Sequence, residues 1–100
     1  MASNTVATAF EFDYAVVDVS DDSTEVSTKA SIIRGVYINT TLSAHALPIQ
    51  DGATPVFTIP ASSTAGQFIP LGDAVFNSGI TVDPNDSATG SITVVYKVVV

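Results

Sequence analysis

Apolar and polar residues alternate with a period of two over much of this 100-residue chain. The clearest case is the segment 5–20, in which Phe10, Phe12, Tyr14 and Val16 share one face. Such alternation is typical of a half-buried β-strand. We therefore expect this face to turn towards a hydrophobic core.

The phase of the alternation changes further along the same segment. Val17 and Val19 are apolar, whereas Asp18 and Ser20 are polar. A slip of one residue predicts either a β-bulge or a strand that passes from one sheet to another.

The rest of the chain predicts further short strands and little or no helix, because no stretch keeps an apolar period of 3.6 residues. Residues 32–39 are apolar on both faces apart from Arg34 and Gly35, which predicts a central strand. Pro48 predicts an edge strand, and Asp51-Gly52 predicts a hairpin turn. The remaining expected strands are 25–29 at an edge, 45–50, 54–59, 67–70, 74–77, 79–82 and 91–100. Short strands separated by turn signals predict an all-β fold: a single small antiparallel β-sandwich or barrel-like sandwich.

Length and charge favour one domain, 1–100, with an acidic N-terminal strand or arm (1–30) and a β core (31–100). Residues 1–25 hold six acids and no base, while residues 26–100 hold four acids and three bases, which together give the net charge of −7. Nucleic-acid binding is disfavoured because it needs clustered Lys and Arg. We expect no membrane span and no secretory leader, since no window has 18 apolar residues and the first ten lack a basic start.

Candidate catalytic residues are few. His45 is the only histidine, and a triad with Ser43 and Asp51 lacks the G-x-S-x-G elbow that would support it. Glu11 and Asp13 form a carboxylate pair of the kind used in glycoside hydrolysis, but a solvated strand face explains them as well. We therefore expect no catalytic residues and no enzyme.

A run of oxygen-bearing side chains at residues 83–87 (D-P-N-D-S) suggests a calcium loop. The Gly and Glu that an EF-hand loop requires are out of register. A turn in which Asx side chains bind backbone N–H groups is the better interpretation. We expect no metal and no cofactor.

The chain is rich in apolar residues (46%) and poor in charged ones (13%). Surfaces of soluble monomers usually carry about 25–35% charged residues. Either much of the surface is covered by a partner, as in interface cores, or the outer faces are rich in Thr and Ser. We favour an interface because residues 91–100 and 32–38 both lack a clean polar face. The last strand has to be covered by its own core or by a partner.

Four segments carry a resemblance to a known group of proteins. They are R-G-V-Y-I at 34–38, D-G at 51–52 leading into V-F-T-I-P-A at 56–61, A-G at 65–66 followed by I-P at 69–70, and A-T-G-S-I-T-V-V-Y at 88–96. In order and spacing they resemble small structural proteins of tailed bacteriophages and gene-transfer particles, which lie on the head surface as decoration or spike-base proteins. The similar stretch covers residues 33–98, and residues 1–30 fall outside it.

The resemblance implies a non-enzymatic virion protein that forms a trimer or small ring and binds the major capsid protein. Our leading hypothesis is a capsid decoration (cement) protein, made in the host cytoplasm and placed on the outer capsid surface. The alternatives are a head spike-base or tail-associated adaptor, and a carbohydrate-binding β-sandwich module. The residues expected at protein contacts are Phe10, Phe12, Tyr14, Tyr96, Val98, Val99 and Val100.

Overall fold

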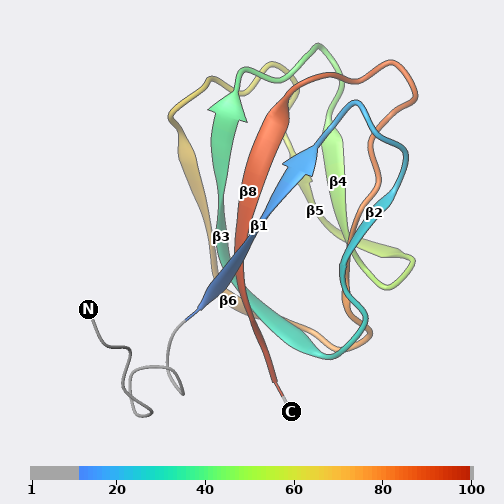
Figure 1. The fold of residues 1–100 in the computed structure, drawn as a ribbon, viewed down its shortest axis with the longest axis vertical. Helices are drawn as coiled ribbons and strands as arrows, with labels where there is room; N and C mark the ends of the chain where they lie inside the picture. Colours follow the sequence, from blue (N-terminus) through green and yellow to red (C-terminus); the bar gives the residue numbers. More distant parts are fainter. Residues whose placement is uncertain (1–11, 100) are drawn as a thin grey trace.

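Two four-stranded antiparallel sheets pack face to face (Figure 1). The computed structural model describes residues 12–99. No helix is present in this described part, so the predicted all-β sandwich is confirmed. The strands are β1 (Asp13–Asp18), β2 (Thr24–Ser27), β3 (Ser31–Thr40), β4 (Leu47–Asp51), β5 (Thr54–Ile59), β6 (Phe68–Phe76), β7 (Ile80–Val82) and β8 (Ser91–Val98).

One sheet, which we call sheet A, has the strand order β1-β8-β3-β6, and the other, sheet B, has the order β2-β7-β4-β5. The apolar strand β8 is therefore covered within its own sheet, by β1 on one side and β3 on the other (Figure 1). Just past the strand, the Val99 N–H donates to the Ala30 carbonyl oxygen at 2.8 Å. The partner that this strand requires is supplied by the fold itself.

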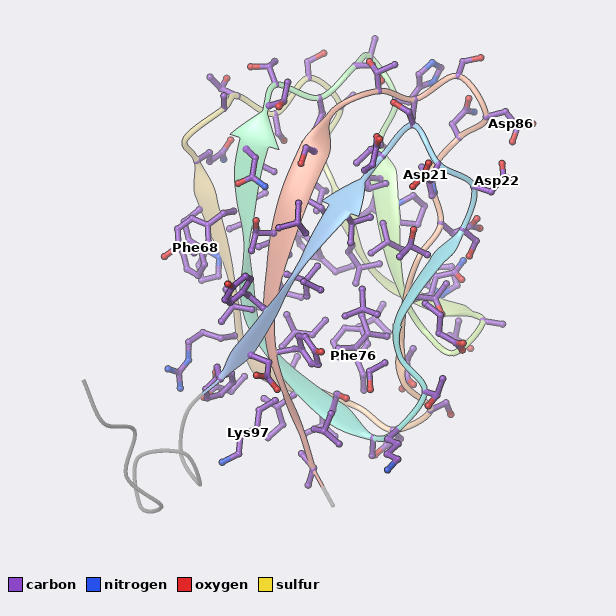
Figure 2. All side chains as sticks on the ribbon, viewed as in Figure 1. Asp21, Asp22, Phe68, Phe76, Asp86 and Lys97 are labelled. Atoms are coloured by element: carbon purple, nitrogen blue, oxygen red, sulfur yellow. The ribbon has the colours of Figure 1, made fainter. Side chains whose placement is uncertain are left out.

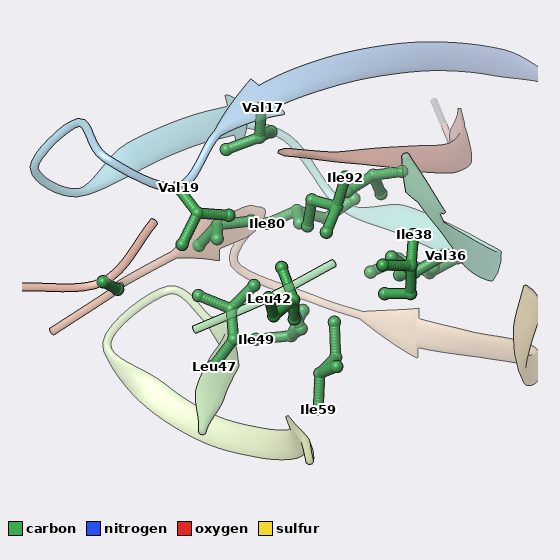
Figure 3. Close-up of a cluster of buried hydrophobic side chains, with 14 of the residues drawn as sticks. Val17, Val19, Val36, Ile38, Leu42, Leu47, Ile49, Ile59, Ile80 and Ile92 are labelled. Carbon is green, nitrogen blue, oxygen red and sulfur yellow. The ribbon is translucent and has the colours of Figure 1, made fainter. Parts of the chain in front are cut away.

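The hydrophobic core lies between the inner faces of the two sheets (Figure 3). Alternate residues of each strand point inward, as the pleat of a strand requires. Burial of such a side chain contributes roughly 1.5–3 kcal/mol, so the core is the main source of stability. Its fully buried side chains include Phe76, Ile33, Ile38, Leu47, Ile49, Ile59, Ile80, Ile92, Val17, Val19, Val36 and Val82.

The predicted core face of the first strand was wrong. Val17 and Val19 are buried, whereas the side chains of Tyr14 and Val16 are 73% and 65% exposed. The predicted bulge is also absent, because β1 pairs with β8 in unbroken register from Asp13 to Asp18. β1 is apolar on both faces, and the alternation alone did not determine which face turns inward.

Two other strand predictions need correction. β4 is not an edge strand, since it lies between β7 and β5. Pro48 is tolerated there because its carbonyl accepts the Asp83 N–H, 3.2 Å, beyond the last residue that pairs with β7. A strand residue directs its N and O towards the same edge, so the Pro48 nitrogen also faces Asp83, past the end of β7, and the β4–β5 ladder loses no donor. The pieces 67–70 and 74–77 form one strand, β6, which continues past an irregularity at Gly72 and Asp73.

The other strand predictions hold. β2 is an edge strand of sheet B, β3 is central in sheet A, and β4 and β5 form the predicted hairpin. The described part of the acidic N-terminal region belongs to both sheets, because β1 lies in sheet A and β2 in sheet B. Residues 12–30 are therefore part of the sandwich rather than an arm added to it.

Candidate interaction surface

The outer face of sheet A, the side turned away from sheet B, carries apolar side chains in rows that cross all four strands. The strand register places Val16, Thr93, Tyr37 and Phe68 in one row. Tyr14, Val95, Gly35 and Pro70 form the next row, and Ile32 lies between Lys97 and Val75 in the third. Because directly opposite residues of a sheet share a face, these side chains form one continuous surface.

This surface holds most of the large apolar side chains that the described part exposes. Seven such residues are exposed, and five of them lie on the outer face of sheet A: Tyr14, Val16, Tyr37, Phe68 and Val75. The other two are Val56 in β5 and Val99 beyond β8. Scattered apolar residues need no explanation, but a contiguous exposed patch is typical of an interaction site.

An aromatic pair gives this surface its shape. The ring centroids of Tyr37 and Phe68 lie 4.5 Å apart. The Phe68 ring also lies directly over Gly35, where a Cβ atom would contact the ring and would come within 2.7 Å of the Ile69 carbonyl oxygen. Only glycine leaves room for the ring at this place, so Gly35 allows the Phe68 ring to lie close to the backbone of β3.

An ion pair lies within the surface, between its second and third rows. Arg34 lies at a bulge of β3, and its Nε and Nη2 atoms donate to the two carboxylate oxygens of Asp73 at 3.2 and 3.4 Å. Its guanidinium also lies 3.9 Å from the centroid of the Phe12 ring. Asp73 adopts a φ of 58°, a left-handed conformation that Asp tolerates better than most residues. Both sides of Arg34 are therefore occupied, by a carboxylate and by a ring.

Most acidic side chains lie away from this surface. Asp21 and Asp22 follow β1, and Asp86 precedes β8, at the same end of the sandwich (Figure 2). The Arg34 and Lys97 side chains belong to sheet A. The molecule thus combines an apolar, weakly charged sheet face with an acidic end.

The residues predicted at protein contacts separate into two groups. Tyr14 lies on the outer face of sheet A, and the Phe12 ring contacts Arg34 beside it. Tyr96 and Val98 stand opposite Ile33 and Ser31, which are buried, so they point to the inner side. Val99 is 47% exposed beyond β8, and the remaining two, Phe10 and Val100, lie outside the described residues.

The residues of the possible triad have other roles. The Ser43 hydroxyl accepts the Thr89 N–H at 3.1 Å. The Asp51 carboxylate accepts the N–H groups of Asn77 and Ser78 at 3.1 and 2.7 Å. His45 and Asp51 stand near opposite ends of β4, so Ser43 and Asp51 fix loops rather than a reaction centre.

The oxygen-rich loop at residues 83–87 forms the predicted Asx turn. The Asn85 side-chain oxygen accepts the Ser87 N–H at 2.9 Å, and its carbonyl accepts the Ala88 N–H at 2.9 Å. Within residues 12–99, no group of three or more His, Asp or Glu side chains could hold a metal ion. Asp13 is exposed, and Glu11, its partner in the proposed carboxylate pair, precedes the described residues.

Sequence reasoning missed four contributors to the outer face: Val16, Tyr37, Phe68 and Val75. The available signal was the apolar character of both faces of 12–19 and 32–38. Phe68 and Val75 gave no local signal, because they were assigned to separate short strands. Only the register of β6 against β3 brings them together.

Three comparisons with known proteins found no match. No family model, no curated protein and no solved structure matches the chain. Among the described residues there is no helix with the length and hydropathy to cross a membrane.

Proposed function

We propose that this chain is a virion structural protein, a capsid decoration (cement) protein that self-associates and binds the major capsid shell through the outer face of sheet A. The observation that carries the proposal is the concentration of exposed apolar side chains on that face. The order of the phage-like segments supplies the biological setting.

Two features of the surface support a protein partner. It extends over four strands, which suits a broad contact better than a small ligand. It carries the aromatic pair Tyr37–Phe68 and Arg34, and aromatic residues and Arg are enriched at protein interfaces. Burial of the exposed rings and valines on binding would supply the main driving force.

Three of the four phage-like segments also meet at this surface. The R-G-V-Y segment provides Arg34, Gly35 and Tyr37, and the I-P segment provides Pro70 opposite Gly35. The T-V-V-Y segment provides Thr93 and Val95 between β1 and β3. Three of the four segments that suggested the resemblance therefore contribute to the proposed contact, whereas the segment at 51–61 lies in sheet B.

The test is binding to particles. Purified particles from the source virus should contain the chain in hundreds of copies, measured by quantitative mass spectrometry. Particles that lack the chain should bind the purified protein in saturable amounts. Tens of copies or fewer would point instead to a spike-base or tail adaptor, and absence from particles would refute the proposal.

A matched pair of variants locates the contact. Val75→Glu places a charge on the outer face of sheet A, whereas Val56→Glu places the same charge on sheet B. The two side chains are similarly exposed, 55% and 51%. We expect Val75→Glu to lose particle binding and Val56→Glu to keep it. Equal binding by both variants would remove the outer face of sheet A from the proposal.

A carbohydrate-binding module is the second candidate, and the exposed pair Tyr37–Phe68 favours it. Exposed aromatic rings are common in sugar sites, although those sites are usually concave and carry convergent polar groups. One polar group near the pair, the Asn39 amide, is already used within the protein, because it donates to the Thr93 hydroxyl at 2.7 Å. Glycan-array binding that is lost in Tyr37→Ala would support this candidate over the first.

A further inference from the structure

The edges of the two sheets differ in how they are protected against pairing with another strand. β2 has four residues and a register shift, β5 carries Pro55 and a shift, and β6 carries Pro70 and the irregularity at Gly72-Asp73. Short strands, prolines and bulges are the usual devices that protect an edge. Among the described strands, β1 is the edge that has none of them, since it pairs regularly over six residues without Pro or Gly.

One hydrogen bond identifies which backbone groups of β1 point away from β8. The Val19 N–H donates to the Gly90 carbonyl at 2.9 Å, and these two residues continue the register of β1 against β8. Antiparallel residues alternate between those that bond to the neighbouring strand and those that point away from it. Counting back by twos from Val19, the intervening residues Tyr14 and Val16 direct their N–H and C=O groups to the free edge.

We propose that two copies of this chain pair β1 with β1 across a twofold axis at Ala15, so that two A sheets of four strands join into one antiparallel sheet of eight. In this register Tyr14 stands opposite Val16 of the second copy, and Val16 stands opposite Tyr14. Each of the two pairs exchanges two N–H···O bonds, so four bonds form. The contact is isologous, as in most homodimers.

The side chains favour this register. Tyr14 and Val16 are the two most exposed large apolar residues of the described part, and aromatic rings opposite β-branched residues stabilise antiparallel pairs. An axis at Val16 would pair Tyr14 with Asp18, whose carbonyl already accepts the Asp21 N–H at 3.1 Å. An axis at Tyr14 would pair Val16 with Phe12, which precedes the strand and contacts Arg34.

Charge permits the pairing but weakens it at low salt. With the axis at Ala15, no two carboxylates are directly opposed, because Asp13 stands opposite Val17 of the second copy. Asp18 of that copy is one position further along the ladder, on the opposite face of the sheet. The two Asp13 residues lie four positions apart along the ladder, about 13 Å at 3.3 Å per residue. That separation exceeds the Debye length of about 8 Å at physiological ionic strength, whereas the closer Asp13–Asp18 pairs are screened less. Since each copy carries a net charge of −7, added NaCl should strengthen the dimer.

This inference rests on the proposed function only for its setting, since it names the surface through which the protein would self-associate. In the dimer the two outer faces of sheet A become one apolar surface that crosses eight strands. Each dimer would then carry two copies of the surface that is proposed to bind the capsid shell. Two linked contacts bind more tightly than either alone.

Sedimentation measurements on the full chain test the dimer. We expect the mass to rise with concentration from the 10.3 kDa of one chain towards twice that value. Val16→Pro removes an N–H that points away from β8, so it should raise the dimer Kd at least tenfold and leave the monomer folded. Val16→Thr keeps the N–H and should keep the dimer. A wild-type chain that stays monomeric up to its solubility limit, or a dimer that weakens as NaCl rises, would overturn the proposal.

A cross-link tests the register even if Val16→Pro fails to fold. Ala15 and its copy would form a non-hydrogen-bonded pair with a Cα–Cα distance of about 4.5 Å, within the range of a disulfide. The chain has no cysteine, so Ala15→Cys introduces a single thiol. On mild oxidation it should form a disulfide-linked dimer much faster than the control Val56→Cys. Equal rates, or a faster link through Val16→Cys, would overturn the register.

The two proposals fail separately. A dimer with no affinity for particles would refute the decoration role and leave the β1 pairing intact. A monomeric chain that is present on particles would refute the β1 pairing and leave the decoration role intact.

Discussion

The inner and outer faces of sheet A are both apolar, but they are built differently. On the inner face, Ile33, Val36 and Ile38 are fully buried against sheet B. On the outer face, Tyr37 and Val75 are about half exposed, and a glycine makes room for Phe68. The inner face gives stability to the folded chain, whereas the outer face adds little stability until something covers it. Burial, rather than hydrophobicity, separates the two roles.

The largest difference in stability should separate two phenylalanine variants of the same strand, β6. Phe76 is fully buried and Phe68 lies on the outer face. Phe76→Ala should lower the free energy of unfolding by about 3–5 kcal/mol, because it removes a buried ring and leaves a cavity. Phe68→Ala should cost roughly 1 kcal/mol, the value of an exposed aromatic contact. Urea unfolding of both variants checks this, and equal losses would show that the outer face is part of the core.

Adjacent valines of β1 give a closer comparison. Val17→Thr places a hydroxyl in the core and should cost about 1–3 kcal/mol. Val16→Thr changes the exposed neighbour and should alter stability by no more than about 0.5 kcal/mol. Thermal unfolding of the two variants measures the difference. The reverse order would mean that the face assignment of β1 is wrong.

Gly35→Ala tests how the outer face is shaped. The added Cβ would meet the Phe68 ring and the Ile69 carbonyl, so we expect a loss of about 1–3 kcal/mol from overpacking. Adding Phe68→Ala should recover part of that loss, because it removes the ring but not the carbonyl. A double-mutant cycle in urea measures the coupling, and additive losses would contradict the proposed contact.

The smallest effect should come from the Arg34–Asp73 ion pair. The Arg34 and Asp73 side chains are 54% and 49% exposed, so water and salt weaken their attraction. Asp73→Asn should therefore cost less than about 1 kcal/mol. The cost should vanish at high NaCl concentration, as measured by thermal unfolding. A cost that persists in salt would indicate that Asp73 matters through its backbone conformation instead.

These comparisons also explain what the sequence could predict. The strand period and the turn residues identified an all-β sandwich, the central position of β3 and the β4–β5 hairpin. The faces of β1 were assigned wrongly because Tyr14, Val16, Val17 and Val19 offer two apolar faces of similar strength. Burial in the core between the two sheets, formed with residues distant in sequence, decides between them.

The interaction surface was harder to predict because it depends on pairing between distant strands. Phe68 and Tyr37 become neighbours only through the register of β6 against β3. Pro48 misled the assignment of β4 because a proline is excluded only where its nitrogen would meet a paired strand. These features depend on register, which a single sequence specifies weakly when both faces of a strand are apolar.

The central position of β8 has a consequence for biosynthesis. Because β8 joins β1 to β3, sheet A cannot close while residues 91–98 are still inside the ribosome. Until then β1 and β3 have no common neighbour, and their apolar faces remain open to other nascent chains or to chaperones. Pairing over such a sequence separation is intrinsically slow. The strand translated last among those described thus sets the moment at which the domain becomes a folded unit.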